Sequence, residues 1–237
     1  MTFLIIPTYN ERENIEGLIR LILDLPSGPD LNIVVVDDNS PDGTGEIVDK
    51  LAKELPNVHL ISRKKLKGRG TAGIEGFRYA LSQGANYIIE MDADLSHHPK
   101  YIPLFINAIK DCDVVIGSRF VKGGRDIDRG IVRRVITRLA GLYVRYLLGL
   151  RIKDVSSGYR CFRREVLEKV DVDNLISTGP SIVLEIIYNA AMNNFKIKEV
   201  PITFQDRRQG ETKLDYITLL ETMVMVLRLR KMHKEGK

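Results

Sequence analysis

The first 118 residues alternate short apolar runs with segments of helical periodicity, and this alternation restricts the possible folds more than any other feature. Apolar runs occupy residues 3–7, 32–38, 58–63, 87–91 and 114–117. Helical spacing is found at 11–23, 44–55 and 71–83, and Pro99 is placed to open a fourth helix. The β-branched run at 33–36 has no polar alternation, as in a strand buried on both faces. The order predicts an α/β fold whose central sheet is mostly parallel, with helices on both faces.

Polar clusters follow each predicted strand. The carboxyl ends of parallel strands meet at one edge of a sheet, and ligands of such sheets bind beyond that edge. The clusters that we expect there are 7–11, 37–38, 63–70, 92–94 and 118–119. Of Asp37 and Asp38, one is expected to accept hydrogen bonds from a base or ribose, and capping of the next helix is the alternative.

Asp92-Ala93-Asp94 places two carboxylates on one face of a strand end, because side chains at i and i+2 point the same way. Their repulsion favours a bound cation, and hard oxygen ligands suit Mg²⁺ or Mn²⁺. A solvated acidic loop in which Asp94 or Ser96 caps the next helix is the alternative. We expect His97 and His98 at the surface, with a role as metal ligand or proton donor as the second possibility.

Residues 68–73 fit the pattern G-x-G-x-x-G, which also occurs in dinucleotide-binding folds. This motif follows the third predicted strand instead of the first, and residues 64–67 separate it from that strand. We therefore expect a tight loop with nearby basic side chains facing phosphates, and NAD binding is the competing interpretation.

Positive charge is concentrated in residues 119–169, which hold 14 Lys and Arg against 5 Asp and Glu. Anionic lipid, a phosphorylated substrate or nucleic acid would suit this segment, and a solvated basic face without a partner is the alternative. The lack of base-stacking aromatic residues around its arginines counts against RNA. Segments 131–150 and 215–231 are amphipathic with basic flanks, as in helices that lie in a membrane interface, and covering the sheet is the alternative. A further helix at 181–193, a strand at 197–204 and a glycine-rich loop at 121–129 are also expected.

The two cysteines, Cys112 and Cys161, are expected to be packing residues, and no apolar run is long enough to predict a transmembrane helix or a signal peptide. A membrane- or RNA-associated binding module with a degenerate nucleotide site is the alternative from another functional class.

Taken together, these motifs resemble glycosyltransferase family 2, which has the Rossmann-like GT-A fold. The matching stretches are 7–11 (PTYNE), 36–44 (VDDNSPDGT), 91–99 (MDADLSHHP), 117–119 and 207–213, and the resemblance covers about 3–214. Within the family, the chain is similar to the dolichyl- and polyprenyl-phosphate mannosyltransferases without transmembrane segments. Asn39 stands where the family usually has Gly, and Thr137 where Ser is usual.

The resemblance implies a role for each matching residue. The guanosine end of the donor would be held by Pro7, Tyr9, Glu11, Val36 and Asp38. The donor diphosphate would meet Asp92, Ala93, Asp94, Arg207 and Lys213. The metal would be held by Asp92, Asp94 and Ser96, and the acceptor phosphate by Arg119, Arg133 and Thr137. Asp94 and Arg119 would be the catalytic residues.

The reaction so implied is an inverting, metal-dependent transfer of mannose from GDP-mannose to dolichyl or another polyprenyl phosphate. Transfer of glucose from UDP-glucose, or another reaction of the family, is the alternative. We expect residues 1–214 to form the catalytic domain and residues 215–237 an amphipathic helix that faces the membrane or a membrane-anchored partner subunit. The expected location is peripheral, on the cytosolic face of a membrane, with no nucleic acid as partner.

Overall fold

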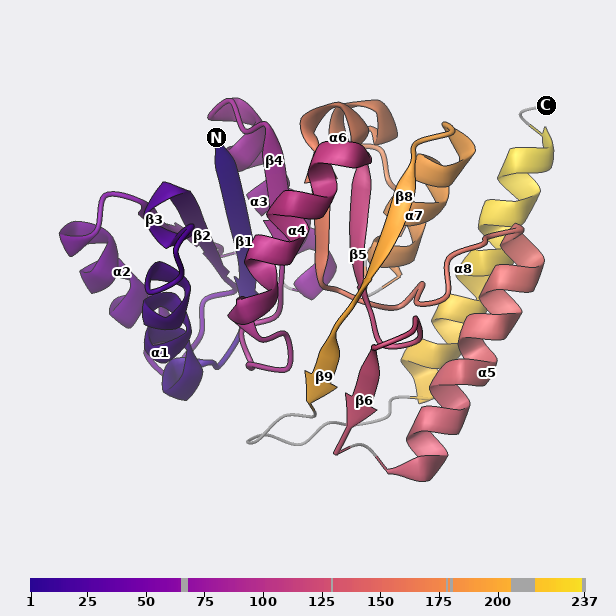
Figure 1. Cartoon of the computed structure of the whole chain (residues 1–237), viewed down its shortest axis with the longest axis horizontal. Coiled ribbons are helices and arrows are strands. Elements are labelled where there is room, and N and C mark those ends of the chain that lie inside the picture. Colours follow the sequence, from indigo (N-terminus) through magenta and orange to yellow (C-terminus); the bar gives the residue numbers. More distant parts are fainter. Residues whose placement is uncertain (65–67, 129, 178, 180, 206–215, 236–237) are drawn as a thin grey trace.

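The computed structural model describes residues 1–64, 68–128, 130–177, 179, 181–205 and 216–235, without the side chains of 29, 216–220 and 233–235. Seven strands form one sheet in the order β3-β2-β1-β4-β7-β5-β8 (Figure 1). They are β1 (Thr2–Thr8), β2 (Leu31–Asp37), β3 (Val58–Ser62), β4 (Tyr87–Glu90), β5 (Val114–Ser118), β7 (Arg160–Arg163) and β8 (Ile197–Pro201). Every pairing is parallel except those of β7 with β4 and β5. The prediction of a mostly parallel sheet is confirmed.

Helices cover both faces of this sheet. One face carries α1 (Arg12–Leu23), α2 (Thr44–Glu54) and α4 (Ile102–Ala108). The other carries α3 (Arg69–Ser82), α5 (Ile131–Leu148), α6 (Arg164–Val170), α7 (Ile182–Met192) and α8 (Tyr216–Glu235). Short 3₁₀ turns are η1 (Gly28–Asp30), η2 (Pro99–Tyr101) and η3 (Ile109–Asp111).

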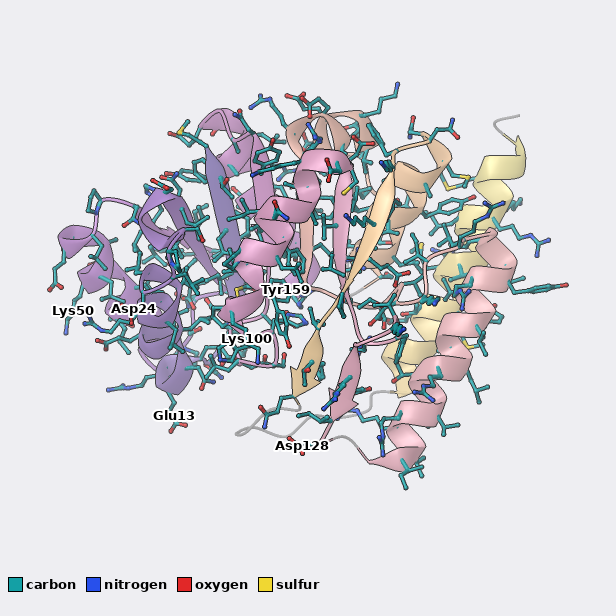
Figure 2. All side chains as sticks on the ribbon, viewed as in Figure 1. Glu13, Asp24, Lys50, Lys100, Asp128 and Tyr159 are labelled. Atoms are coloured by element: carbon teal, nitrogen blue, oxygen red, sulfur yellow. The ribbon has the colours of Figure 1, made fainter. Side chains whose placement is uncertain are left out.

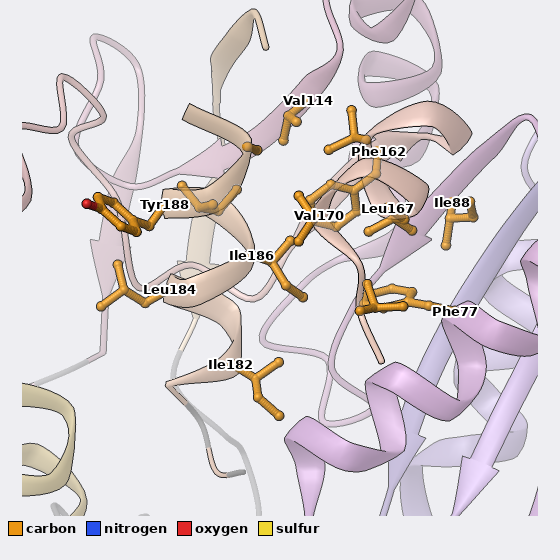
Figure 3. Packing of buried hydrophobic residues seen from close by; sticks show 14 of the residues in the cluster. Phe77, Ile88, Val114, Phe162, Leu167, Val170, Ile182, Leu184, Ile186 and Tyr188 are labelled. Atoms are coloured by element: carbon orange, nitrogen blue, oxygen red, sulfur yellow. The ribbon is translucent and has the colours of Figure 1, made fainter. Parts of the chain in front are cut away.

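Alternate residues of the central strands enter the two hydrophobic cores. In β1, Leu4 packs on the side of α1 while Ile5 packs on the side of α3, and both are fully buried. Because both faces of the strand are covered, no position is left for polar side chains, which explains the unbroken apolar runs. The core on the side of α3 extends across α7. In it, the rings of Phe77 and Phe162 meet edge to face, with their centres 5.9 Å apart (Figure 3).

Residues 151–180 hold two elements for which we expected none. β7 inserts antiparallel between β4 and β5, and α6 follows it directly. The four residues of β7 include arginines at both ends, so the strand lacks the apolar signature of its neighbours. The buried positive charge of Arg160 has a negative charge opposite it in the sheet, because Arg160 is in register with Glu90.

A second, two-stranded parallel sheet joins β6 (Arg125–Ile127) to β9 (Thr203–Gln205). The expected loop at 121–129 therefore contains a strand, and the single strand expected at 197–204 is divided into β8 and β9 at Ile202. The Ile202 backbone N–H donates to Ser118 at 3.1 Å and its carbonyl accepts from Arg125 at 2.9 Å. This arrangement carries the chain beyond the end of β5, on the side of the polar clusters.

α5 and α8 lie side by side at one end of the molecule (Figure 1). Val144 and Leu148 of α5, with Val226 and Leu229 of α8, are buried in the same core as α3 and α7. In the described part of the chain, no helix combines the length and the apolar character that crossing a bilayer requires. Cys112 and Cys161 are both buried, as expected of packing residues.

Candidate active site

The polar clusters converge at the carboxyl ends of the parallel strands, where backbone N–H groups and side chains of successive loops hydrogen bond to one another. After β1, the N–H of Asn10 donates to Ser40 Oγ beyond β2 at 2.9 Å. After β3, the N–H of Gly68 donates to Asp38 Oδ2 at 2.6 Å. The loops that follow β1, β2 and β3 are thereby fixed in one polar rim.

The segment Asp92–His97 forms a tight turn just beyond β4. Oδ1 of Asp94 accepts from the Ser96 backbone N–H at 3.0 Å and from Ser96 Oγ at 2.6 Å. Leu95 between them has φ +62°, a left-handed conformation that costs a branched residue on the order of 1–3 kcal/mol. Asp94 is 8% exposed and Ser96 3%. The turn thus holds a nearly buried carboxylate and hydroxyl in fixed positions at the rim.

His97 belongs to this turn and is 2% exposed, so the expectation that it lies at the surface is wrong. Its Nδ1 accepts the backbone N–H of Asp92 at 3.1 Å, and its ring stacks on Tyr159 at 5.1 Å. Tyr159 lies in the interior of the molecule, close to the rim (Figure 2). Burial lowers the pKa of His97, which favours the neutral imidazole whose Nδ1 accepts this hydrogen bond. His98 is exposed as predicted, and it accepts the N–H of Lys100 at 3.1 Å.

Arg69, at the first residue of α3, is ion-paired with Asp92. Its Nε and Nη2 lie 2.7 Å and 2.5 Å from Asp92 Oδ1, and its Nη1 lies 3.8 Å from Glu90. Burial alone would lower the pKa of Arg69, but Asp92 and Glu90 outweigh it and the pKa is raised. Glu90 and Asp92 share a strand face because they are two residues apart. That spacing is the signal by which Glu90 could have been added to the site from the sequence.

The donor set of this turn fits a hard divalent cation. Asp92 and Asp94 supply carboxylate oxygens and Ser96 a hydroxyl, and Mg²⁺ commonly uses one or two carboxylates together with substrate phosphates. Among the described residues, no group of three or more His, Cys, Asp and Glu side chains is arranged as a complete metal site. The remaining ligands would have to come from substrate or water.

The two aspartates at the end of β2 have different partners. Asp37 accepts from the backbone N–H of Ser40 at 3.0 Å and from its hydroxyl at 2.5 Å, so it shapes the turn. Asp38 is 2.7 Å from Nη1 of Arg63, besides its bond to Gly68. Asn39 has φ +56°, a conformation that Gly and Asn tolerate better than other residues. This backbone requirement explains how Asn39 can stand where the resembled family has Gly.

The other residues expected at the nucleotide end lie on the same rim. Pro7 and Val36 are buried register partners in β1 and β2, and Ala93 is buried between the two aspartates. Tyr9 is half exposed, and Glu11 accepts from Asn14 Nδ2 at 2.8 Å. These positions are compatible with the expected roles, which remain predictions.

Arg119, directly after β5, is held by a buried acid that the sequence did not indicate. Its Nε and Nη2 donate to the two carboxylate oxygens of Asp154 at 2.8 Å and 2.7 Å. Nη2 also donates to Ser156 at 2.8 Å, and the guanidinium lies 5.3 Å from the ring of Phe204. Burial alone would lower the pKa of Arg119, but Asp154 outweighs it and the pKa is raised. The guanidinium is fixed and permanently charged at the rim.

The remaining expected residues are on α5 or outside the described residues. Thr137 donates to the carbonyl of Arg133 at 2.9 Å. In the described part of the chain, no hydrogen bond or ion pair joins Arg119 to Arg133 or Thr137. Arg207 and Lys213, expected at the donor phosphates, lie outside the described residues.

Two glycines of 68–73, Gly70 and Gly73, are required by the close packing of α3. A Cβ at Gly73 would lie 2.8 Å from Glu90, and one at Gly76, a turn further along α3, would collide with Ile5 of β1. A Cβ at Gly70 would collide with the backbone of Gly179. Gly68, which precedes the helix, has φ +125°, a conformation that favours glycine. Packing and backbone conformation therefore account for the pattern without a dinucleotide.

Comparisons with known proteins agree with this geometry. The family described as glycosyl transferase family 2 matches residues 3–171. An undecaprenyl-phosphate mannosyltransferase from Micrococcus luteus is 40% identical over 94% of this chain and 91% of its own length. A polyprenol monophosphomannose synthase from Mycolicibacterium smegmatis is 40% identical over 95% and 85%. A dolichol-phosphate mannosyltransferase from Pyrococcus furiosus is 42% identical over 98% of this chain, which spans 64% of that relative.

Solved structures show the same fold. Glucosyl-3-phosphoglycerate synthase from Mycobacterium tuberculosis, with Mg²⁺ and UDP, superposes with a TM-score of 0.71 at 20% identity over 97% of this chain and 79% of the other. The same enzyme with Mn²⁺, UDP and glucosyl-3-phosphoglycerate gives a TM-score of 0.69. At this identity the likeness concerns the fold alone.

Proposed function

The chain belongs to glycosyl transferase family 2 and has the GT-A fold, and from this premise we propose that it transfers mannose from GDP-mannose to a polyprenyl phosphate with the help of a divalent cation. The curated relatives named above support the sugar and the lipid class, because three of them bear mannosyltransferase or mannose synthase names at 40–42% identity. The donor nucleotide and the metal rest on the motif resemblance and on the donor chemistry of the turn.

The observation that carries the proposal is the Asp92–His97 turn. It sets two carboxylates and a hydroxyl at the rim, next to the loops of β1 and β2 that would receive the nucleoside. A divalent cation held by Asp92, Asp94 and Ser96 would neutralise charge on the diphosphate leaving group.

The transfer itself needs little proton chemistry from the protein. A phosphate monoester has a second pKa near ~6, so the acceptor is largely dianionic at neutral pH and needs no general base. One of its oxygens forms a bond to the anomeric carbon as the bond from that carbon to the GDP oxygen breaks. Attack in line with the leaving group inverts the anomeric configuration. The protein therefore acts by alignment and by charge stabilisation.

The fixed cation Arg119 suits one phosphate of this reaction. Asp154 and Ser156 hold its guanidinium in place, so the side chain would lose little rotamer freedom when a phosphate binds. We assign it, with Arg133 and Thr137 of α5, to the acceptor phosphate, and Arg207 and Lys213 to the phosphates of the donor.

The acceptor is a lipid, so we also propose peripheral attachment to a membrane. α5 exposes large apolar residues along one side, among them Val132 at 74% and Tyr146 at 87%. α8 beside it exposes Val224 and Leu227. An apolar surface of this kind, with arginines next to it, suits a helix pair that lies in the lipid interface, or one that docks on a membrane-anchored partner.

The decisive experiment is the transfer of labelled sugar to an organic-extractable lipid. We expect label to move from GDP-mannose to polyprenyl phosphate, and the transfer to stop with EDTA. Asp94→Ala should reduce it by about 100-fold or more, because that carboxylate acts where charge develops. Asp49→Ala on α2 is the control, since among the described residues that carboxylate pairs with Lys53 alone, at the surface.

Label moving only from UDP-glucose would instead support glucosyl transfer by the same site. Full activity of Asp94→Ala would refute the role of the Asp92–His97 turn.

A further inference from the structure

A cavity of about 460 Å³ lies between α5 and the segment that follows β5. It is lined by Arg119, Phe120, Val121, Gly124, Arg138, Gly141, Leu142, Arg145 and Lys153. None of the described residues in its wall is acidic. Four cationic residues around one cavity indicate an anionic ligand.

Three of these cations have no carboxylate partner among the described residues. Arg119 is paired with Asp154, but no described acidic residue forms an ion pair with Arg138, Arg145 or Lys153. The nearby carboxylate of Glu199 is occupied by the backbone N–H groups of Lys153 and Asp154, at 2.8 Å and 2.9 Å.

The arginines of α5 are also positioned by their surroundings. The guanidinium of Arg138 lies 5.7 Å from the ring centre of Phe120, whose ring is 5.1 Å from the guanidinium of Arg119. Nε of Arg145 is buried and meets no hydrogen-bond acceptor of the described residues.

The cavity borders the apolar side of α5. At 100° per residue, Arg138 and Arg145 lie next to the exposed side of the helix that includes Leu139 and Tyr146. Leu142 belongs to that exposed side and also lines the cavity. Around the helix axis, Arg133 is turned roughly 120–140° and Thr137 roughly 80–100° away from Arg138 and Arg145. On this helix, the two cavity arginines therefore face a different direction from Arg133 and Thr137, which were assigned above to the acceptor phosphate.

We propose that this cavity binds the phosphate of an anionic membrane lipid headgroup, at a site that adjoins the one for the acceptor and shares Arg119 with it. With the apolar side of α5 among the acyl chains, Arg138 and Arg145 stand at the level where lipid phosphates lie. Such a site would set the depth and rotation of the protein on the membrane. It goes beyond the proposed sugar transfer, and its test needs neither donor nor acceptor.

The test is sedimentation of the full chain with vesicles of phosphatidylcholine alone or mixed with phosphatidylglycerol. Gly141→Leu fills the cavity without changing any charge, and a Cβ at Gly141 meets no atom within 4 Å. Arg145→Gln removes one cavity cation. We expect each variant to weaken binding to phosphatidylglycerol vesicles by about fivefold, which corresponds to about 1 kcal/mol per contact, and to leave binding to pure phosphatidylcholine unchanged.

Arg134→Gln is the matched control, because Arg134 is on the same helix and does not line the cavity. If general attraction between a basic surface and anionic lipid accounted for the binding, Arg134→Gln and Arg145→Gln would weaken vesicle binding equally and Gly141→Leu would have no effect. That result would overturn the site. A saturable thermal shift with inorganic phosphate alone, lost in Gly141→Leu while the vesicle preference persists, would assign the cavity to a soluble phosphate and overturn the lipid. An unchanged thermal midpoint in each variant without ligand shows that folding is intact.

Discussion

At the scale of single residues, a metal ion bound by Asp92 would compete with Arg69 for the oxygen that the ion pair uses. The guanidinium contacts Oδ1 with two nitrogens, so a cation that uses this oxygen must displace the ion pair. We expect Arg69→Leu to tighten Mn²⁺ binding in the absence of nucleotide by roughly tenfold, since a partly exposed pair is worth on the order of 1 kcal/mol. Electron paramagnetic resonance of free Mn²⁺ measures this directly.

Arg78→Leu is the control for that experiment, because Arg78 is on the same helix and pairs with Asp173 and Glu75 away from the rim. Equal Mn²⁺ affinity in wild type and Arg69→Leu would show that the ion pair does not restrict the metal.

Asp42 is a second residue with a measurable effect, since its carboxylate joins the first residues of two helices. It accepts from the backbone N–H of Arg12 in α1 and of Thr44 in α2, both at 3.0 Å. Burial alone would raise the pKa of Asp42, but the hydrogen bonds from Thr44 and Arg12 outweigh it and the pKa is lowered. We expect Asp42→Ala to reduce the free energy of unfolding at neutral pH by about 1 kcal/mol.

The pH dependence of this loss follows from the lowered pKa. The stabilisation by Asp42 is complete above the pKa of the unfolded chain, about 3.9, and is lost as the pH falls through the lower value of the folded protein. In urea unfolding, the difference between wild type and Asp42→Ala should therefore narrow below about pH 4. A difference that stays constant down to the acid limit would contradict the assignment of Asp42.

At the scale of elements, α8 carries two leucines with opposite environments. Leu229 is 4% exposed within the core, and Leu227 is 53% exposed on the side that we propose for the membrane. We expect Leu229→Ala to reduce the free energy of unfolding by about 2–5 kcal/mol, as for other buried leucines, with little direct effect on lipid binding. Leu227→Gln should leave stability within about 0.5 kcal/mol and weaken vesicle binding.

Denaturant unfolding and vesicle sedimentation of the same two variants separate these effects. If Leu227→Gln destabilised the fold as much as Leu229→Ala, α8 would be a purely structural helix.

The elements show why the sequence allowed some predictions and not others. The strands of the first 118 residues were predictable because each is a β-branched or apolar run that ends in polar or turn residues. β7 was not, since its buried Arg160 has partners that the folded chain brings together: Glu90 lies opposite it in the sheet, and it donates to three backbone carbonyls, those of Val155, Ser157 and Val183. His97 was misplaced for a related reason, because the ring that buries it, Tyr159, is distant in sequence. The Asp92–Asp94 pair was found because the i, i+2 spacing is local.

At the scale of the whole molecule, the division into a catalytic domain at 1–214 and a separate C-terminal helix can be tested by unfolding. Val226 and Leu229 are buried in the same core as α3, α5 and α7. We therefore expect one cooperative transition, with circular dichroism and tyrosine fluorescence giving coincident curves. A first transition at low denaturant that removes helical signal alone would mean that α8 unfolds independently.

β7 also constrains the order in which the sheet can form while the chain is being synthesised. Its ladders join residues 160–163 to strands that end at Glu90 and Ser118, so β4 and β5 keep open edges until the ribosome has passed that point. At about 5–20 residues per second, translation to residue 160 leaves the edge of β5 exposed for roughly 2–8 s and that of β4 for roughly 4–14 s. Open strand edges invite pairing with a neighbouring chain. Crowded polysomes are therefore the setting in which this sheet is most vulnerable, and chaperone demand should peak on nascent chains of that length.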